Sequence, residues 1–279
     1  MTASGENRGV NGPGGGSIWI IAERLLGDGT ISANGGGSNA NNNKGGGGGG
    51  RVAVYVTGAS SSQTSLATDF TGVISSFGGD GLNFGKAHSP GAAGTVYLET
   101  HADRGKGHMI IRNDSEKLAR AASKGWTLYG TAQICNGVTW NVSALAISDH
   151  GRVGINRGGE LHVPSFSVIT GDGSTANILR FNDGGELTSD VLHDVLVADG
   201  FGIESYGTST IAEHHVVIPE SSTLKVAGTL TVGSLKLNGV KLAKGTYSAM
   251  TLAETYANVS GEGTIEVLGL EKGLVVVFW

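Results

Sequence analysis

The run of six glycines at positions 45–50 constrains the fold of this chain more than any other feature. It lies between Lys44 and Arg51 and leads straight into the alternating segment VAVYV at 52–56. Glycine has no side chain to bury, so such a run persists in a folded chain only where backbone packs against backbone or turns too tightly for a Cβ atom. We therefore expect a β-rich fold that includes tightly packed backbone.

The composition is that of a folded chain and not of a fibre. Glycine accounts for 49 of the 279 residues and proline for only 4, without the three-residue period of collagen. Hydrophobic residues make up 39% of the chain and charged residues 15%, which is too apolar for a disordered protein. A chain of this length buries a core without disulfide or metal staples, as one elongated domain or two small ones.

Charge and cysteine content exclude several classes of partner. The formal net charge is −5 and no run of basic residues stands out, so we expect no nucleic-acid partner. The single Cys135 has no cysteine to pair with in the chain, and we interpret it as a small apolar filler. No stretch approaches the 18 apolar residues of a transmembrane helix. Residues 1–9 lack the apolar region of a signal peptide, and we expect a fragment of a longer protein.

Short strands separated by glycine or polar turns are predicted along most of the chain. Residues 34–43 are nearly all Gly, Asn, Ser and Ala. Two structures fit them: a flexible surface loop, or packed glycine-rich strands with polyproline-II-like geometry. The one helical signal lies at 115–123, where Asp114 is the expected N-cap.

These signals predict an all-β chain in three parts. A glycine-rich β module covers 1–112, a short helical connector 113–123, and a β-solenoid 124–279. The solenoid is expected to end in a β-hairpin cap, because Asn238-Gly239 signals a tight turn.

An internal repeat predicts how the solenoid stacks. The sequence INRGGEL at 155–161 recurs as FNDGGEL at 181–187, an offset of 26 residues. This spacing suits one coil of a parallel β-solenoid, in which each coil buries its inward residues only by stacking on the next. Chance similarity in a glycine-rich chain is the alternative. The predicted stacked pairs are Ile155 with Phe181, Leu161 with Leu187, and Asn156 with Asn182.

Two sets of segments resemble known exported proteins. The segments GGSIWI (15–20), GTISANGG (29–36), GGGGRVAVY (47–55) and AGTVYL (93–98) resemble a glycine-rich module of large exported bacterial proteins. Residues 224–268 resemble the closing segment of autotransporter-associated β-repeat proteins. The resemblance implies a right-handed parallel β-helix, a passenger-like surface region and a secreted or cell-surface location. It implies nothing about activity, because the matching positions are framework.

The repeat also places two glutamates, Glu160 and Glu186, in register. Adjacent strands lie about 4.8 Å apart, and two carboxylates that close do not both ionise freely, so the pKa of one is expected to rise. The spacing is near that of retaining glycosidases. By alternation His162 and Asp190 share this outward face, so the predicted catalytic residues are Glu160, His162, Glu186 and Asp190. A solvated acidic stripe, relieved by arginines or a bound cation, is the alternative.

Other candidate sites are weaker. A second cluster, formed by Asp190, His193, Asp194, Asp199 and Glu213-His214-His215, lacks metal-ligand spacing, and surface or loop histidines are the alternative. We expect no metal site and no cofactor, except that residues 77–85 resemble a calcium-binding nonapeptide, for which a plain turn is the alternative. Three aromatic residues form a sugar-stacking platform if they face outward, and otherwise fill the coil interior: Trp126, Tyr129 and Trp140.

Two functions from different classes follow from these features. The first is a secreted or cell-surface β-solenoid that displays a binding face for a polysaccharide or a cell-surface glycan. The second is a polysaccharide-cleaving enzyme, a glycoside hydrolase or lyase, that uses the paired carboxylates on the same face. The oligomeric state is left open.

Overall fold

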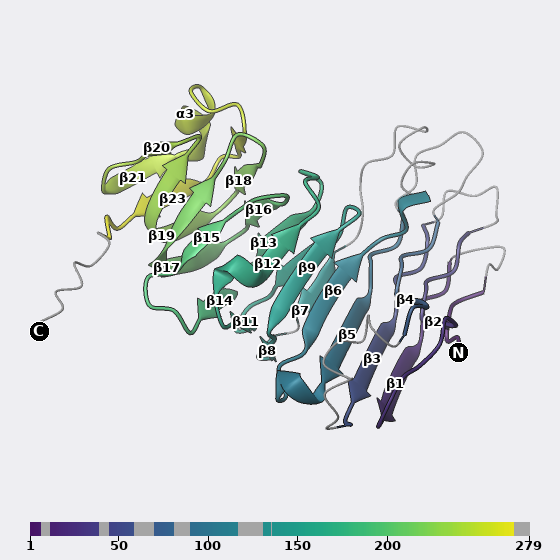
Figure 1. Cartoon of the computed structure of the whole chain (residues 1–279). Coiled ribbons are helices and arrows are strands. Elements are labelled where there is room, and N and C mark those ends of the chain that lie inside the picture. The colour runs from purple at the N-terminus through teal and green to yellow at the C-terminus, as the bar shows by residue number, and fades with distance from the viewer. Residues whose placement is uncertain are drawn as a thin grey trace, which may run out of the picture.

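The computed structural model confirms the all-β class and shows extensive parallel sheets (Figure 1). Strands lie side by side in a long row from β1 near the N-terminus to β20, β21 and the helix α3 (Ala249–Ala253) near the C-terminus. The structure describes residues 1–6, 12–38, 45–58, 70–80, 90–116, 131–134 and 136–270.

Three sheets contain nearly all of the strands. Sheet I has the order β1 (Ser17–Ala22), β3 (Arg51–Val56), β5 (Thr95–Thr100), β6 (His108–Arg112), β9 (Ala144–Ser148) and β12 (Ile169–Gly171). Only its β5–β6 pair is antiparallel, with the short helix η2 (His101–Asp103) between those two strands. A separate parallel pair joins β2 (Thr30–Ser32) to β4 (Val73–Ser75).

Sheet II is entirely parallel. Its order is β22 (Val259–Ser260), β18 (Leu224–Val226), β16 (Gly202–Ser205), β13 (Ile178–Phe181), β10 (Arg152–Ile155) and β7 (Ala132–Ile134).

Sheet III carries the polar row described below. Its order is β21 (Gly245–Ser248), β23 (Thr264–Val267), β19 (Thr229–Leu237), β17 (Thr208–Ile218), β14 (Glu186–Ser189), β11 (Glu160–Val163) and β8 (Thr139–Asn141). Two further strands lie off this path: β15 (Val195–Val197) pairs with β17, and β20 (Val240–Lys241) pairs with β19.

Between β7 and β14 the chain visits sheets II, III and I in rotation, so each strand pairs with the one that follows a full round later. The short helix η3 (Phe166–Val168) lies on the way from sheet III to sheet I. The predicted stacking is confirmed by the register, in which Ile155 pairs with Phe181 and Leu161 with Leu187. The predicted amide pair also forms, with Asn182 Nδ2 donating to Asn156 Oδ1 at 2.7 Å.

Period-two alternation sends one set of these side chains inward. Val153, Ile155, Leu161 and Phe181 are fully buried in one large hydrophobic core. Burying a side chain of this size stabilises the fold by about 1.5–3 kcal/mol. On β11 the alternate residues Glu160 and His162 are held on the outer face of sheet III.

The glycine run at 45–50 packs backbone against backbone on several sides. Gly47 N–H donates to Gly36 O at 3.0 Å, and Gly79 N–H donates to Gly47 O at 2.7 Å. Gly15 N–H donates to Gly48 O at 2.9 Å, and Gly49 N–H donates to Ala92 O at 2.8 Å. The run thus bonds to four other segments, whereas a strand in a sheet bonds to two neighbours in one plane. Side chains would block such contacts.

Residues 34–38 belong to this glycine bundle, which we define as residues 12–16, 33–38, 45–50, 76–79 and 91–94. Gly35, Gly36, Gly37 and Ser38 are buried, and Gly35 N–H donates to Phe77 O at 2.8 Å. Residues 34–38 are therefore packed backbone and not a surface loop, while their polyproline-II-like geometry stays a prediction. Residues 39–43 lie outside the described residues.

The buried face of sheet I changes sides between β5 and β6. Val52, Val54 and Val96 face a small core shared with the glycine bundle. Tyr97 instead pairs with Met109, and both side chains contact the large core on the opposite face. One continuous sheet therefore forms a wall of both cores.

The connector and the C-terminal end were predicted in part. Asp114 Oδ1 accepts from Glu116 N–H at 3.0 Å, and Ser115 and Glu116 are helical; residues 117–123 lie outside the described residues, and the domain boundaries stay a prediction. The tight turn at Asn238-Gly239 is confirmed by the antiparallel pairing of Leu237 with Val240. The helix α3 was not predicted.

Candidate functional site

A row of polar side chains crosses the outer face of sheet III. Glu160 on β11 pairs in register with Glu186 on β14 and with Thr139 on β8, as the 26-residue repeat predicts for the two glutamates. Strands in such a ladder are about 4.8 Å apart. The sheet therefore holds two carboxylate side chains on adjacent strands of one face.

Threonine hydroxyls occupy both oxygens of Glu160. Thr188 Oγ1 donates to Glu160 Oε1 at 2.6 Å, and Thr139 Oγ1 donates to Glu160 Oε2 at 3.1 Å. Hydrogen bonds that end on a charged group are shorter and stronger than neutral ones. These two contacts fix the position of the Glu160 carboxylate, while Glu186 is exposed.

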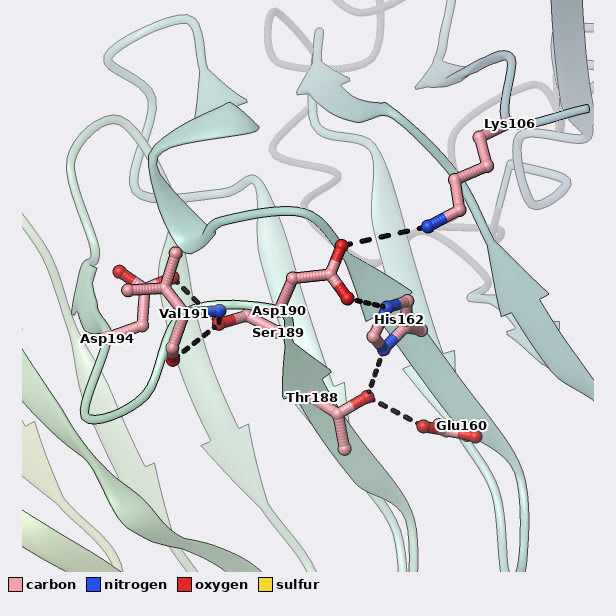
Figure 2. A network of polar contacts seen from close by, with 8 residues as sticks. All are labelled: Lys106, Glu160, His162, Thr188, Ser189, Asp190, Val191 and Asp194. Atoms are coloured by element: carbon pink, nitrogen blue, oxygen red, sulfur yellow. Dashed lines mark hydrogen bonds and ion pairs between the residues drawn. The ribbon is translucent and has the colours of Figure 1, made fainter. Parts of the chain in front are cut away.

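His162 continues the row from Thr188 to Asp190, as Figure 2 shows. Its Nδ1 lies 2.8 Å from Thr188 Oγ1, and its Nε2 lies 3.1 Å from Asp190 Oδ1. Because Thr188 has given its one proton to Glu160, His162 Nδ1 must be the donor to Thr188. Lys106 Nζ reaches Asp190 Oδ2 at 3.7 Å, so the row ends in an ion pair with a residue of another sheet.

We call this set the polar row: Lys106, Thr139, Glu160, His162, Glu186, Thr188 and Asp190. Of the four predicted catalytic residues, three are joined in it through Thr188, and Glu186 lies beside Glu160 by register. Their catalytic role stays a prediction.

Three members of the polar row were not among the predicted site residues. Thr188 was detectable, because alternation from Glu186 places it on the same face. Thr139 precedes Glu160 by 21 residues, so the 26-residue offset does not reveal it. Lys106 belongs to the turn between β5 and β6 of another sheet, and no pattern within sheet III points to it.

Asp194, next to the polar row, stabilises the local structure through hydrogen bonds. Its Oδ2 accepts from Phe166 N–H at 2.6 Å and from Ser189 Oγ at 2.9 Å, and its Oδ1 accepts from Val195 N–H at 2.8 Å. Burial alone raises the pKa of Asp194, but these hydrogen bonds outweigh it and hold the pKa below its ordinary value. The carboxylate thus fastens the loop after β14 to the start of η3.

His214 and His215 are both buried, although neighbours in a regular strand face opposite sides. The β17–β19 register shifts between Ile211 and His215, so regular alternation is broken there, and both rings are covered by neighbouring residues. His214 packs edge-on against Phe166, and burial lowers the pKa of His214. His215 Nδ1 lies 2.6 Å from Ser234 Oγ. The surface histidines expected here are wrong for these two residues.

Within the described ranges, no three His, Cys, Asp or Glu side chains come together in a group that could hold a metal ion. The calcium-like segment at 77–85 lies outside the described residues from position 81 onward. In the part of the chain that the structure describes, no helix is long and apolar enough to cross a membrane.

The predicted aromatic platform is only partly visible. Trp140 pairs in register with the buried Leu161 and packs against the large core, so its ring lies on the core side of β8 and not beside Glu160. Trp126 and Tyr129 lie outside the described residues, as does Cys135. A part in binding stays a prediction for the three aromatic residues.

No protein-family model, curated protein or solved structure matches this chain.

Proposed function

We propose that the chain is a secreted or cell-surface protein that presents the polar row as a binding face for glycan. The single observation that carries this proposal is the row itself, in which hydroxyl, carboxylate, imidazole and ammonium groups lie side by side on the outer face of sheet III. A sugar has several hydroxyl groups on adjacent carbons. A row of fixed donors and acceptors is suited to bind them.

We infer that the stacked strands form a right-handed parallel β-helix. The rotation of the chain through three sheets and the parallel pairing of each round with the next support this fold. Crossovers between parallel strands of one sheet are right-handed in about 98% of cases. The resemblance of the glycine-rich segments to modules of exported bacterial proteins supports the surface location.

The second candidate is a retaining glycoside hydrolase, which the register of Glu160 and Glu186 favours. Retaining enzymes hold their two carboxyl groups about 5–5.5 Å apart. Glu160, fixed by two hydroxyls, suits the nucleophile, which bonds to the anomeric carbon as the glycosidic C–O bond breaks. Glu186 donates its proton to the leaving oxygen, and water then hydrolyses the glycosyl ester while Glu186 recovers a proton.

One experiment separates the two candidates. A panel of plant and bacterial polysaccharides is scored both for retention of the protein in affinity electrophoresis and for release of reducing ends. Glu160→Gln, Glu186→Gln and His162→Gln are compared with Glu220→Gln, which makes the same charge change as the glutamate variants at an exposed residue outside the row.

For the binding face, we expect retention without release, and affinity about tenfold weaker in Glu160→Gln and His162→Gln, since hydrogen bonds to charged groups contribute about 1.5–3 kcal/mol. Release that a single glutamate variant abolishes would establish the enzyme instead. Equal retention of all four variants and the unchanged protein would exclude the polar row as the binding face.

A further inference from the structure

The outer face of β1, β3 and β5 carries large apolar side chains that are exposed to solvent. Ile18, Val52 and Val54 face the small core, so alternation turns Trp19, Ile21 and Tyr55 outward. Trp19 is 69% exposed and Ile21 is 66% exposed. Exposed large apolar groups that gather on one face mark interaction sites more often than scattered ones do.

Three rings on this face form a continuous stack. The Trp19 and Tyr55 ring centroids are 5.1 Å apart with an interplanar angle of 22°. The Tyr55 and Tyr97 centroids are 5.5 Å apart with an angle of 50°. Tyr97 also packs against the large core. The stack is therefore anchored at Tyr97 and open to solvent at Trp19.

Hydrogen bonds fix the anchored end. Tyr97 Oη donates to Glu99 Oε2 at 2.6 Å and accepts from Gly107 N–H at 2.7 Å, while Glu99 Oε1 accepts from Gly105 N–H at 3.1 Å. Burial, followed by the hydrogen bond to Glu99, raises the pKa of Tyr97 above its ordinary value. The hydroxyl thus stays protonated and the ring cannot turn away, which lowers the entropy lost when a ligand binds.

A cavity opens beside the stack where β3 and β5 end. Its volume is about 560 Å³, inside the range of roughly 300–1,000 Å³ that small-molecule sites occupy. Lining residues include Tyr55, Thr57, Glu99, His101 and Arg104. Residues that carry an aromatic ring, a hydroxyl, a carboxylate and a guanidinium therefore line one cavity.

The turn that carries Arg104 holds an uncommon backbone conformation. Arg104 has φ 51° and ψ 44°, the left-handed region that bulky residues rarely adopt. Asp103 fixes the turn, because its Oδ2 accepts from Thr100 N–H at 2.7 Å and from Thr100 Oγ1 at 2.9 Å. Strained residues of this kind cluster at ligand sites, and here the strain places Arg104 at the cavity.

We propose that the Trp19–Tyr55–Tyr97 stack and the adjoining cavity bind the pyranose rings of a glycan chain. The apolar face of one sugar ring packs on the exposed Trp19 ring and the half-buried Tyr55 ring, and the next sugar ring enters the cavity. There Glu99 and Thr57 accept hydroxyl protons, and Arg104 donates to ring or carboxylate oxygens. The inference rests on the proposed glycan-binding function, but places a site on sheet I that is separate from the polar row.

The chemistry of the site favours a sugar. Flat rings open to solvent match the flat apolar face of a pyranose, while the charged and hydroxyl groups of the cavity match its polar edge. A ligand without hydroxyl groups would displace water from Glu99 and Arg104 and form no hydrogen bonds in its place. Leaving charged groups without hydrogen-bond partners costs free energy.

The test uses cellohexaose, chitohexaose and hexagalacturonate as probes, and titration calorimetry gives the affinity. The ¹H–¹⁵N signal of the Trp19 indole, assigned by its loss in Trp19→Phe, reports contact at the stack directly. The variants are Trp19→Ala and Arg104→Gly, the latter keeping the left-handed turn without the guanidinium. Leu192→Ala is the matched control, since Leu192 is 75% exposed and lies outside the site.

We expect at least one probe to shift the Trp19 indole signal, and its affinity to fall about tenfold or more in Trp19→Ala, as for buried aromatic anchors at interfaces. Leu192→Ala should bind this probe as the unchanged protein does. If a probe binds but leaves the indole signal unmoved and loses affinity only in Glu160→Gln, this inference is wrong and the polar row stands. If no probe and no polysaccharide binds, both proposals fail.

Discussion

The glycine bundle and the stacked strands after residue 131 both use parallel segments, but they make opposite demands on side chains. In the bundle, Gly47 approaches the backbone of other segments so closely that a Cβ would overlap the carbonyl group of Pro13. In the stacked strands, Phe181 and Leu161 fill the space between sheets and have no exposed surface. The glycine bundle is stable because its residues have no side chains between the backbones. The stacked strands are stable because their side chains fill the core.

This difference shows that two kinds of packing can stabilise one chain. Backbone hydrogen bonds dominate where the segments are closest, and each contributes about 0.5–1.5 kcal/mol net. Burial of apolar area dominates where the sheets stand apart, at about 25 cal/mol per Å². The two regions should therefore fail for opposite reasons: the first when atoms are added, the second when they are removed.

The largest effect is expected from adding one methyl group to the bundle. Gly47→Ala should destabilise the protein by about 4 kcal/mol or more, because the neighbouring atoms are backbone and cannot move aside. Gly48→Ala is the matched control: its Cβ would meet only Ala92 O, at 4.0 Å. Urea unfolding and hydrogen exchange of residues 45–58 measure the difference. Equal losses in the two variants would refute close backbone packing as the reason for the glycine run.

Removing a ring should have the next largest effect, and in the other region. Phe181→Ala should cost about 3–5 kcal/mol, since the buried ring leaves a cavity between stacked rounds. Hydrogen exchange should quicken first in β10, β13 and β16, which are neighbours in sheet II. Exposed Leu192→Ala serves as the control, with an expected change within about 0.5 kcal/mol. Faster exchange in the glycine bundle ahead of sheet II would contradict separate packing.

The smallest effect is expected in the pH dependence of stability, through Asp194. Because hydrogen bonds hold the pKa of Asp194 below its ordinary value, the folded state favours the ionised form. The stabilisation that Asp194 contributes is fully present above its pKa in the unfolded state, about 3.9. It is lost as the pH falls through the pKa of Asp194 in the folded state. Asp194→Asn should cost about 1 kcal/mol at pH 7 and little below pH 3, because bonds to a charged acceptor are the stronger ones.

Urea unfolding between pH 2.5 and pH 7 measures this dependence. Asp199→Asn, at an exposed aspartate shortly after β15, should leave the curve almost unchanged. A constant cost of Asp194→Asn across the whole range would show that its charge has no part in holding η3.

The stacked region was predictable because its sequence repeats. The match of residues 155–161 with 181–187 is enough to place Ile155 on Phe181 and Glu160 beside Glu186, and the register agrees. Alternation then brings His162 and Asp190 to the same face. The polar row was therefore largely visible in the sequence, apart from its contacts with other strands.

The features that the sequence did not predict depend on contacts between segments far apart in the chain. Nothing local in residues 34–38 distinguishes a loop from packed backbone, because glycine, asparagine and serine suit both. Likewise, β5 alternates in the same way whichever face is buried, so the passage of Tyr97 to the large core was not predictable. The exposure of Trp19 was not predictable for the same reason, because its segment was interpreted only as part of the structural framework.

The change of buried face within sheet I has a mechanical consequence. Because β5 and β6 both contribute side chains to the two cores, a hydrogen-bonded sheet joins the cores at this point. A pull on one end loads the backbone hydrogen bonds of a continuous sheet. We therefore expect sheet I to resist bending between the two cores and to hold the Trp19 face in a constant orientation to β12.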